Sequence, residues 1–222
     1  FAVGMEGLAL SERAYQQALA YAKDRIQGTE AGVRGGPKVS IIHHADVRRM
    51  LLVQKATLAA QRALYMQAAS AIDLVHGLED PVVRKQAERV LDYLIPIVKA
   101  WNTDNGVLLT NLAMQVYGGM GYVEETGVSQ YVRDVRITPI YEGTNGVQAL
   151  DLIGRKTAAN GGAVPLALLA EGKEIAQTLA AAAPDLAASL LQAIAAAEQS
   201  VADIVAQMGE QPALAAAASN AY

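Results

Sequence analysis

The sequence contains no cysteine, which excludes disulfides, thiol catalysis, iron–sulfur ligation and thiolate zinc sites. Aromatic residues make up only 5% of the 222 residues and charged residues only 18%, whereas 52% are hydrophobic. This balance excludes a disordered chain. The formal net charge of −4 argues against a nucleic-acid-binding surface, which is normally basic.

Long uninterrupted apolar runs and targeting signals are also missing. The most apolar stretch, residues 179–197, is interrupted by Pro184, Asp185 and Ser189, so we expect no membrane-spanning helix and no membrane partner. The first residues lack the basic region of a signal peptide, and we expect a cytoplasmic protein. Because the chain opens on Phe1 and not on methionine, we expect a fragment or a processed product.

Alanine, leucine and glutamine recur throughout the chain and favour helices. Apolar side chains follow the 3.6-residue helical period over four stretches, 2–27, 44–75, 81–117 and 144–158. The alanine-rich remainder predicts two more helices that meet at Pro184-Asp185. Long antiparallel helices joined by short loops indicate an all-α fold, an up-and-down bundle with extra C-terminal helices.

Glycine and proline mark the boundaries of these helices. Gly28 is placed to end the first helix, and the glycine-rich residues 28–40 are typical of a surface loop. Pro96 lies inside the third helix, where it predicts a kink or a short break. Residues 118–145 are the least regular part, and no segment shows the sustained period-2 alternation of a β-domain.

One stretch carries most of the candidate chemistry. It runs from Gln115-Val-Tyr-Gly-Gly-Met-Gly-Tyr122 through Arg133-Asp134 to Ile140-Tyr-Glu-Gly-Thr144. Glycines permit close approach of a ligand and helix N-termini attract anions, so a phosphate-bearing ligand with Glu142 beside it is one interpretation. The alternative is an ordinary loop, with Glu142 as a first-turn carboxylate and Arg133-Asp134 as a structural pair. Spacing alone leaves both open.

Two adjacent histidines, His43 and His44, stand at the predicted start of the second helix. Neighbouring positions point to different faces of a helix, so they cannot form the paired ligands of a metal site. We therefore interpret them as helix-start residues and expect no metal.

In this order, these blocks resemble the C-terminal helical domain of the acyl-CoA dehydrogenases. Residues 21–28 resemble the end of that domain's first helix, usually written Arg-x-x-Phe-Gly. The resemblance assigns residues 1–158 to this domain and 159–222 to an alanine-rich extension, with the N-terminal helical and middle β domains expected outside this chain. Residues 28–40, 46–52 and 145–156 are similar to the longer subfamily that includes 3-methylmercaptopropionyl-CoA dehydrogenase.

The resemblance implies α,β-dehydrogenation of an acyl-CoA thioester, a reaction of fatty acid metabolism, with FAD as hydride acceptor. Glu142 matches the base that removes the α-proton, and Arg25 matches the arginine that contacts the FAD pyrophosphate, commonly on a neighbouring subunit. A carboxylate is a weak base in water, so the acyl chain must displace water around Glu142. The other residues expected at the cofactor are Gln27, Gln115, Gly118, Gly119 and Thr144. Those expected at the substrate are Tyr141, Glu142 and Gly143.

Two features limit this interpretation. The family's phenylalanine is missing after Gln27, and the chain would hold the base and only part of the FAD site, so we expect weak FAD binding and little activity from it alone. An acyl-CoA oxidase remains an alternative, as does a helical module for oligomerisation or nucleic-acid binding, like the alkylation-response relatives. The intact Tyr-Glu-Gly-Thr favours the dehydrogenase. The implied partners are an electron-transfer flavoprotein and further copies of the chain in a dimer or tetramer, without nucleic acid.

Overall fold

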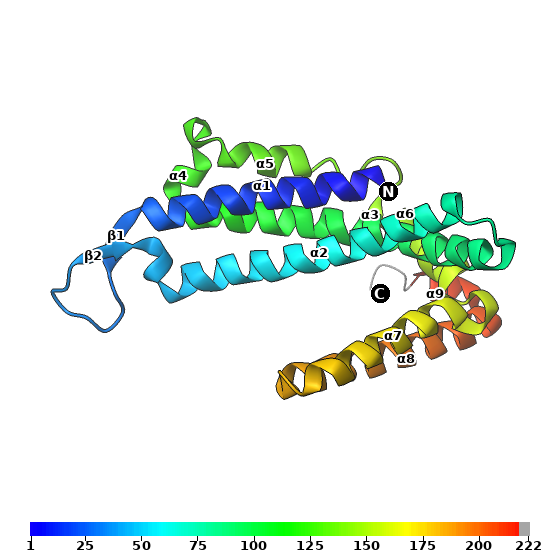
Figure 1. Cartoon of the computed structure of the whole chain (residues 1–222). Coiled ribbons are helices and arrows are strands. Elements are labelled where there is room, and N and C mark those ends of the chain that lie inside the picture. Colours follow the sequence, from blue (N-terminus) through cyan, green and yellow to red (C-terminus); the bar gives the residue numbers. More distant parts are fainter. Residues whose placement is uncertain (218–222) are drawn as a thin grey trace. The chain divides into compact units, whose positions relative to one another are not determined.

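The computed structural model describes residues 1–217, and the prediction of an all-α fold is confirmed. The helices are α1 (Ala2–Asp24), α2 (Ala45–Gly77), α3 (Pro81–Tyr117), α4 (Gly119–Tyr122), α5 (Val128–Val135), α6 (Asn145–Asp151), α7 (Ala163–Ala180), α8 (Pro184–Glu210) and α9 (Pro212–Ala217) (Figure 1). Two strands, β1 (Ile26–Thr29) and β2 (Lys38–Ser40), form a short hairpin. The polypeptide divides into two compact units, residues 1–70 with 98–145 and residues 71–97 with 146 onward.

In the first unit, α1 runs beside α2 and α3, and α5 lies along α1 (Figure 1). Each turn of α1 buries side chains on one face at spacings of three and four residues, as expected from the 3.6-residue period. The buried core consists of Leu8, Ala14, Tyr15, Ala18, Ala22, Ile41, Met50, Leu51, Leu58, Leu109, Ala113, Val116 and Val128.

Helices α1 and α3 approach closely at Gly7. A Cβ atom at this position would lie 2.6 Å from the backbone oxygen of Asn102, which a side chain cannot tolerate. The Ser11 hydroxyl donates a hydrogen bond to the Gly7 carbonyl (2.6 Å) and keeps that carbonyl satisfied inside the core. This close approach fixes the position of α1 along α3 at Gly7.

The end of the first helix differs from the prediction. The helix ends at Asp24 and not at Gly28, because Arg25 is extended (φ −69°, ψ 112°) and its carbonyl accepts a hydrogen bond from Ile41 N–H (2.8 Å). Gly28 lies within β1, with φ 75°. The prediction that residues 28–40 form a loop throughout is therefore wrong at the two ends of this segment. There, β1 and β2 pair antiparallel, with Ile26 opposite Ser40. Such short strands show no alternation that a sequence pattern could reveal.

Two other expectations also need correction. Helix α3 continues from Pro81 to Tyr117 with Pro96 inside it, so a break at Pro96 does not occur, while a kink there stays a prediction. Residues 118–145, predicted to be irregular, contain α5. This helix is flanked by Gly127, whose left-handed backbone (φ 74°) forms its N-cap. Helix α5 was not predicted because it is only eight residues long and follows a glycine.

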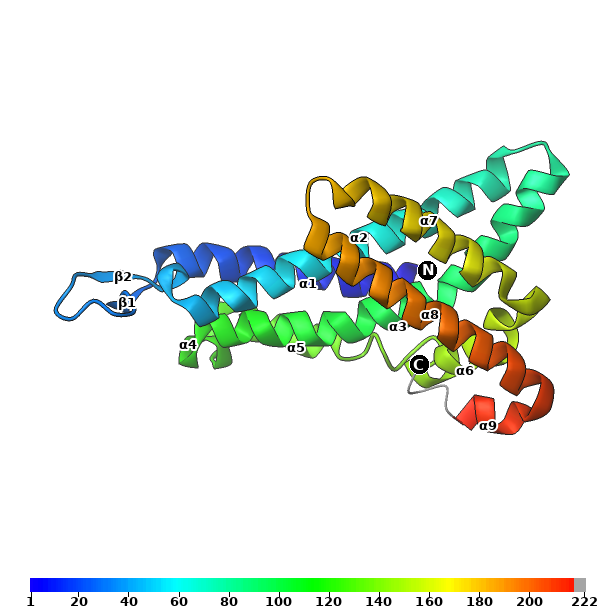
Figure 2. The same cartoon turned by 90° about the horizontal axis from the view of Figure 1, so that it is seen from below.

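In the second unit, α7 and α8 pack side by side, with buried Ala176 on α7 and Ile194 on α8 (Figure 2). The predicted junction is confirmed, since α8 begins at Pro184. After α6 the chain continues as a π-helix, Leu152–Thr157, whose Ile153 packs with Ile204. None of the described helices is long and apolar enough to cross a bilayer.

An ionic cluster also belongs to this unit. The Lys156 ammonium lies 3.1 Å from Asp92 and 2.9 Å from Asp151, with its side chain only 9% exposed. Burial by itself would raise the pKa of Asp151, but hydrogen bonds from Arg155 and Lys156 hold that pKa below its usual value. Two carboxylates thus compensate the buried ammonium.

Candidate functional site

The segment that contains Glu142 is a tight, strained turn between α5 and α6. Glu142 has φ 54° and Gly143 has φ 83°, both in the left-handed region. A glutamate in this region costs roughly 1–2 kcal/mol, and such strain persists only where the surroundings hold it. The Asn145 N–H closes the turn by donating to the Pro139 carbonyl (3.0 Å). Strain at a candidate base is a feature that residue patterns alone do not reveal.

The turn is fixed on one side by Tyr141, whose hydroxyl donates a hydrogen bond to the Glu6 carboxylate of α1. This hydrogen bond is the main cause of a raised pKa at Tyr141. Tyr141 is half-buried, whereas Glu142, Gly143 and Thr144 are exposed on the chain. The substrate-side residues predicted from the sequence are therefore adjacent and accessible.

On its other side the turn is fixed by Asn145, the first residue of α6. Its side-chain amide donates to Thr103 Oγ1 (2.9 Å) and Asp104 Oδ1 (2.8 Å) of α3. Its carbonyl oxygen accepts from the ammonium of Lys99 (2.7 Å). The turn is thus held between α1 and α3 by residues, Asn145 and Lys99, for which no role is predicted from the sequence.

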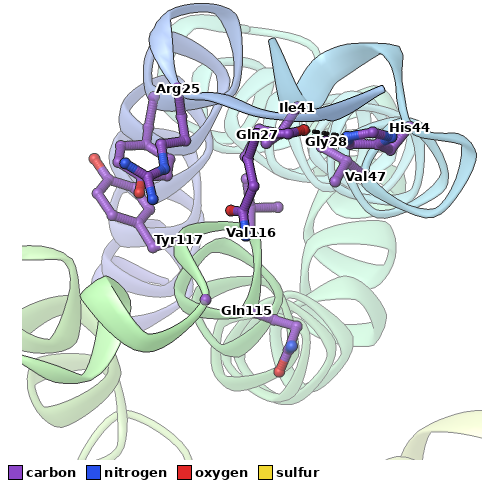
Figure 3. A pocket seen from close by; sticks show the side chains of 11 residues that line it. Arg25, Gln27, Gly28, Ile41, His44, Val47, Gln115, Val116 and Tyr117 are labelled. Carbon is purple, nitrogen blue, oxygen red and sulfur yellow. Dashed lines mark hydrogen bonds between the residues drawn. The ribbon is translucent and has the colours of Figure 1, made fainter. Parts of the chain in front are cut away.

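A pocket of about 400 Å³ opens near the hairpin, at the other end of α1. It is lined by Tyr21, Arg25, Gln27, Gly28, Ile41, His44, Val47, Gln115, Val116, Tyr117 and Gly118. Four of the predicted cofactor residues, Arg25, Gln27, Gln115 and Gly118, therefore meet in one place. In Figure 3, Arg25 and Tyr117 flank one side, His44 and Val47 the other, and Gln27 extends between them.

Two aromatic rings form one wall of this pocket. Tyr21 and Tyr117 stack with centroids 3.9 Å apart and an interplanar angle of 14°. The Tyr117 hydroxyl donates to the Gln17 carbonyl (3.4 Å), and burial raises the Tyr117 pKa. Tyr21 precedes Arg25 by one helical turn, a spacing that could have placed it beside the arginine. Neither tyrosine has a role predicted from the sequence.

His44 has a defined structural role. Its Nε2 lies 2.7 Å from the Gln27 carbonyl and joins the start of α2 to β1 (Figure 3). A Cβ atom at Gly28 would lie 3.3 Å from this ring, so glycine lets the strand pass close to it. The described residues contain no cluster of three His, Asp or Glu side chains that could hold a metal ion.

The other candidate residues of the segment 115–144 are two glycines and the pair Arg133-Asp134. Gly118, with φ 60°, caps α4 and lines the pocket, whereas Gly119 does not line it although its surroundings are open. Arg133 and Asp134 do not pair with each other. Arg133 donates to Gln130 (2.7 Å), and Gln130 donates to Asp134 (2.5 Å), so both belong to a local exposed network on α5.

Glu142 and the pocket are far apart within the first unit. Tyr141 contacts Glu6 near the N-terminal end of α1, whereas Arg25 directly follows its C-terminal end. At a helical rise of about 1.5 Å per residue, Glu6 and Arg25 are separated by about 28 Å. Neither Glu142 nor Thr144 lines the pocket. The structure therefore separates the predicted site residues into two places.

The donor set of the pocket fits part of a dinucleotide cofactor. Arg25 offers a fork for phosphate oxygens, Gln27 and Gln115 offer amide donors and acceptors, and the stacked tyrosines offer an aromatic surface. The volume lies in the lower part of the range of about 300–1,000 Å³ that is common for small-molecule sites. The pocket therefore fits a portion of such a group, not the whole.

Comparison with known proteins gives a consistent result. The family model described as "Acyl-CoA dehydrogenase, C-terminal domain" matches residues 1–157. The chain is 47% identical over 163 residues to 3-methylmercaptopropionyl-CoA dehydrogenase of Ruegeria pomeroyi, a match that covers 73% of this chain and 27% of that protein. The chain thus spans about a quarter of the length of this relative.

Solved structures extend the comparison to three dimensions. Butyryl-CoA dehydrogenase of Megasphaera elsdenii matches 68% of this chain and 34% of its own, with a TM-score of 0.54 and 30% identity. Caenorhabditis elegans ACDH-11, solved in complex with C11-CoA, matches 98% of this chain and 38% of its own, with a TM-score of 0.64. At 22% identity this second likeness bears on the fold alone, but it includes the C-terminal helices.

Proposed function

The chain belongs to the acyl-CoA dehydrogenase family, and we propose that it is the C-terminal part of a flavin-dependent enzyme in which Glu142 removes the α-proton of an acyl-CoA thioester. The observation that carries this proposal is the backbone of Glu142. It is held in the left-handed region by a turn that is fixed to two helices. Strain of this kind accumulates at functional positions. An ordinary first-turn carboxylate would not need it.

The chemistry asked of Glu142 is the removal of a proton from carbon. Its side chain is exposed on this chain, so the acyl substrate and the rest of the enzyme would have to exclude water from it. Water exclusion makes a carboxylate more basic and strengthens every charge interaction around it. Tyr141, tied to Glu6, would then form a fixed wall beside the acyl chain.

The cofactor would bind through the pocket at the hairpin. Arg25 would hold the pyrophosphate, with Gln27 and Gly118 beside it in the pocket. Gln115, which also lines the pocket, and the neighbouring Gly119 would contact the adenosine end. Thr144 would contact the cofactor near Glu142. When bound, FAD supplies the acceptor for the β-hydride.

The separation of about 28 Å between the pocket and the turn along α1 supports an arrangement between subunits. In it, Arg25 of one subunit serves the flavin of its neighbour, while Glu142 of the neighbour acts on that flavin's substrate. The enzyme would therefore be a homo-oligomer, a dimer or tetramer. We place it in the cytoplasm, with an electron-transfer flavoprotein as electron acceptor.

The proposal is tested with the full-length protein purified with FAD. Anaerobic mixing with a ladder of acyl-CoAs, including 3-methylthiopropanoyl-CoA, should bleach the flavin absorbance for at least one chain length. Rapid re-oxidation by oxygen would indicate an oxidase instead of a dehydrogenase. If no acyl-CoA bleaches the flavin, the proposed function is wrong.

A further inference from the structure

Lys99 is a buried lysine whose ammonium forms no ion pair with a carboxylate in the part of the chain that the structure describes. It lies on α3 with 4% of its surface exposed, and its ammonium donates to the neutral Asn145 Oδ1 (2.7 Å). Burial lowers its pKa, which the charge of Asp104 partly opposes. Among the described residues, it forms no ion pair.

Lys156 gives the contrast. Its ammonium is similarly buried, but Asp92 and Asp151 both lie against it. A buried charge is costly unless it is compensated, so a lysine that only stabilises a fold is expected to resemble Lys156. Lys99 lacks such a direct contact with a carboxylate, and its neighbour Asn145 suggests another reason for its burial.

Lys99 determines how the Asn145 side chain is oriented. An ammonium can only donate, so the amide oxygen of Asn145 must face it. The amide nitrogen then faces the Ala100 carbonyl (3.2 Å), Thr103 Oγ1 (2.9 Å) and Asp104 Oδ1 (2.8 Å). If the Asn145 amide were reversed, its NH₂ group would face the Lys99 ammonium, and two donors cannot form a hydrogen bond. This orientation is therefore excluded.

The same residue closes the turn of Glu142 through its backbone. The Asn145 N–H donates to the Pro139 carbonyl (3.0 Å). This hydrogen bond joins the two ends of the segment 139–145, which contains Glu142 and Gly143. A strained backbone persists only where its surroundings over-determine it. The side-chain contacts of Asn145 to α3 are such a constraint.

We propose that Lys99 is a positioning residue, which acts through Asn145 to hold Glu142 in the orientation needed to reach the α-carbon. This inference rests on the proposed function of Glu142. Lys99 itself is not assigned contact with substrate or cofactor. Loss of its ammonium should lower the rate of proton removal without weakening the binding of acyl-CoA, because only the geometry of the base changes.

The test uses the full-length FAD-loaded protein and compares Lys99→Met with Lys99→Gln. Methionine keeps the volume and removes the donor, whereas glutamine keeps a donor for Asn145 Oδ1 without the charge. We expect Lys99→Met to lower kcat about 10- to 100-fold, with KM and FAD content near those of the original protein. Glutamine should recover part of that loss.

A double substitution separates positioning from general damage. In the Glu142→Gln background, Lys99→Met should cause little additional loss, because its effect passes through Glu142. Lys156→Met serves as the buried-lysine control and should lower the unfolding temperature while leaving kcat unchanged. Unchanged kcat in Lys99→Met would overturn the inference, and so would a full additional loss in the double variant.

A second pair of variants needs no change of charge. Thr103 and Thr110 are both fully buried on α3, and each hydroxyl donates to the carbonyl four residues before it. Only Thr103 also contacts Asn145. Thr103→Val should therefore lower kcat while Thr110→Val does not; equal effects would contradict the inference. An inactive original protein would instead refute the proposed function, which keeps the two failures distinct.

Discussion

The Tyr141 hydroxyl donates a hydrogen bond to the Glu6 carboxylate and joins two residues 135 positions apart in the sequence. This contact holds the strained turn of Glu142 at the N-terminal end of α1, while Arg25 lies just beyond the other end. One helix therefore carries the two halves of the candidate machinery about 28 Å apart.

Replacement of Arg25 by glutamine should weaken FAD binding. A hydrogen-bonded charge contributes about 1.5–3 kcal/mol, so we expect the dissociation constant to rise about 10- to 100-fold. FAD titration of the full-length apoprotein measures this. Arg13→Gln on the exposed face of α1 is the matched control and should leave affinity unchanged. Equal affinities for both variants would remove Arg25 from the cofactor site.

Mixed oligomers test whether the two halves serve different subunits. Arg25→Gln and Glu142→Gln chains are each expected to be poorly active alone. After co-expression, an active site built across two subunits recovers both intact groups in about a quarter of sites. Turnover of the mixed preparation well above either parent would support sharing. If Arg25 and Glu142 act within one subunit, mixing restores nothing.

Gly143→Ala should destabilise the turn. Gly143 has φ 83°, where an alanine Cβ costs about 1–2 kcal/mol. We therefore expect a lower unfolding temperature for the full-length protein and reduced turnover. Gly77→Ala is the control, because Gly77 ends α2 with an ordinary backbone and no atom near an added Cβ. A Gly143→Ala protein as stable as the control would show that the turn is not constrained.

The ionic contacts of Asp151 with Arg155 and Lys156 make the stability of the fold depend on pH in the acid range. The pKa of Asp151 is lower in the folded protein than its usual value, mainly through Arg155 and Lys156 acting against burial. The ionised carboxylate thus stabilises the fold above about pH 4, and this contribution is lost as the pH falls through the lowered folded value.

Asp151→Asn should accordingly lower the unfolding midpoint at pH 7 and flatten its decline below about pH 4. Asp46→Asn, which breaks the exposed pair with Arg49, should leave that decline unchanged. Parallel curves for the original protein and Asp151→Asn would contradict this assignment.

The sequence predicted the bundle because its helices are long and periodic. Helix α1 and helices α2, α7 and α8 follow from apolar spacing and from Pro184. Helix α5 and the hairpin escaped because each is short and lies among glycines. Local patterns decide the long elements, whereas short ones depend on tertiary partners such as His44 against the Gln27 carbonyl.

The candidate site was predictable only in part. The resemblance to the family assigned Arg25, Gln27, Gln115 and Gly118 to the cofactor, and these four residues line one pocket. The aromatic pair of Tyr21 and Tyr117 and the support that Lys99 gives to Asn145 arise from contacts between distant segments, which no spacing rule encodes. The positive φ of Glu142 likewise depends on both helices that hold the turn.

The most direct test of the central claim is single-turnover reduction of the flavin by acyl-CoA in the Glu142→Gln full-length protein. Glutamine keeps the shape and the strained backbone but cannot accept the proton. We expect the rate to fall about 10²- to 10⁴-fold, with FAD content and acyl-CoA binding retained. A rate equal to that of the original protein would contradict the assignment of Glu142 as the base.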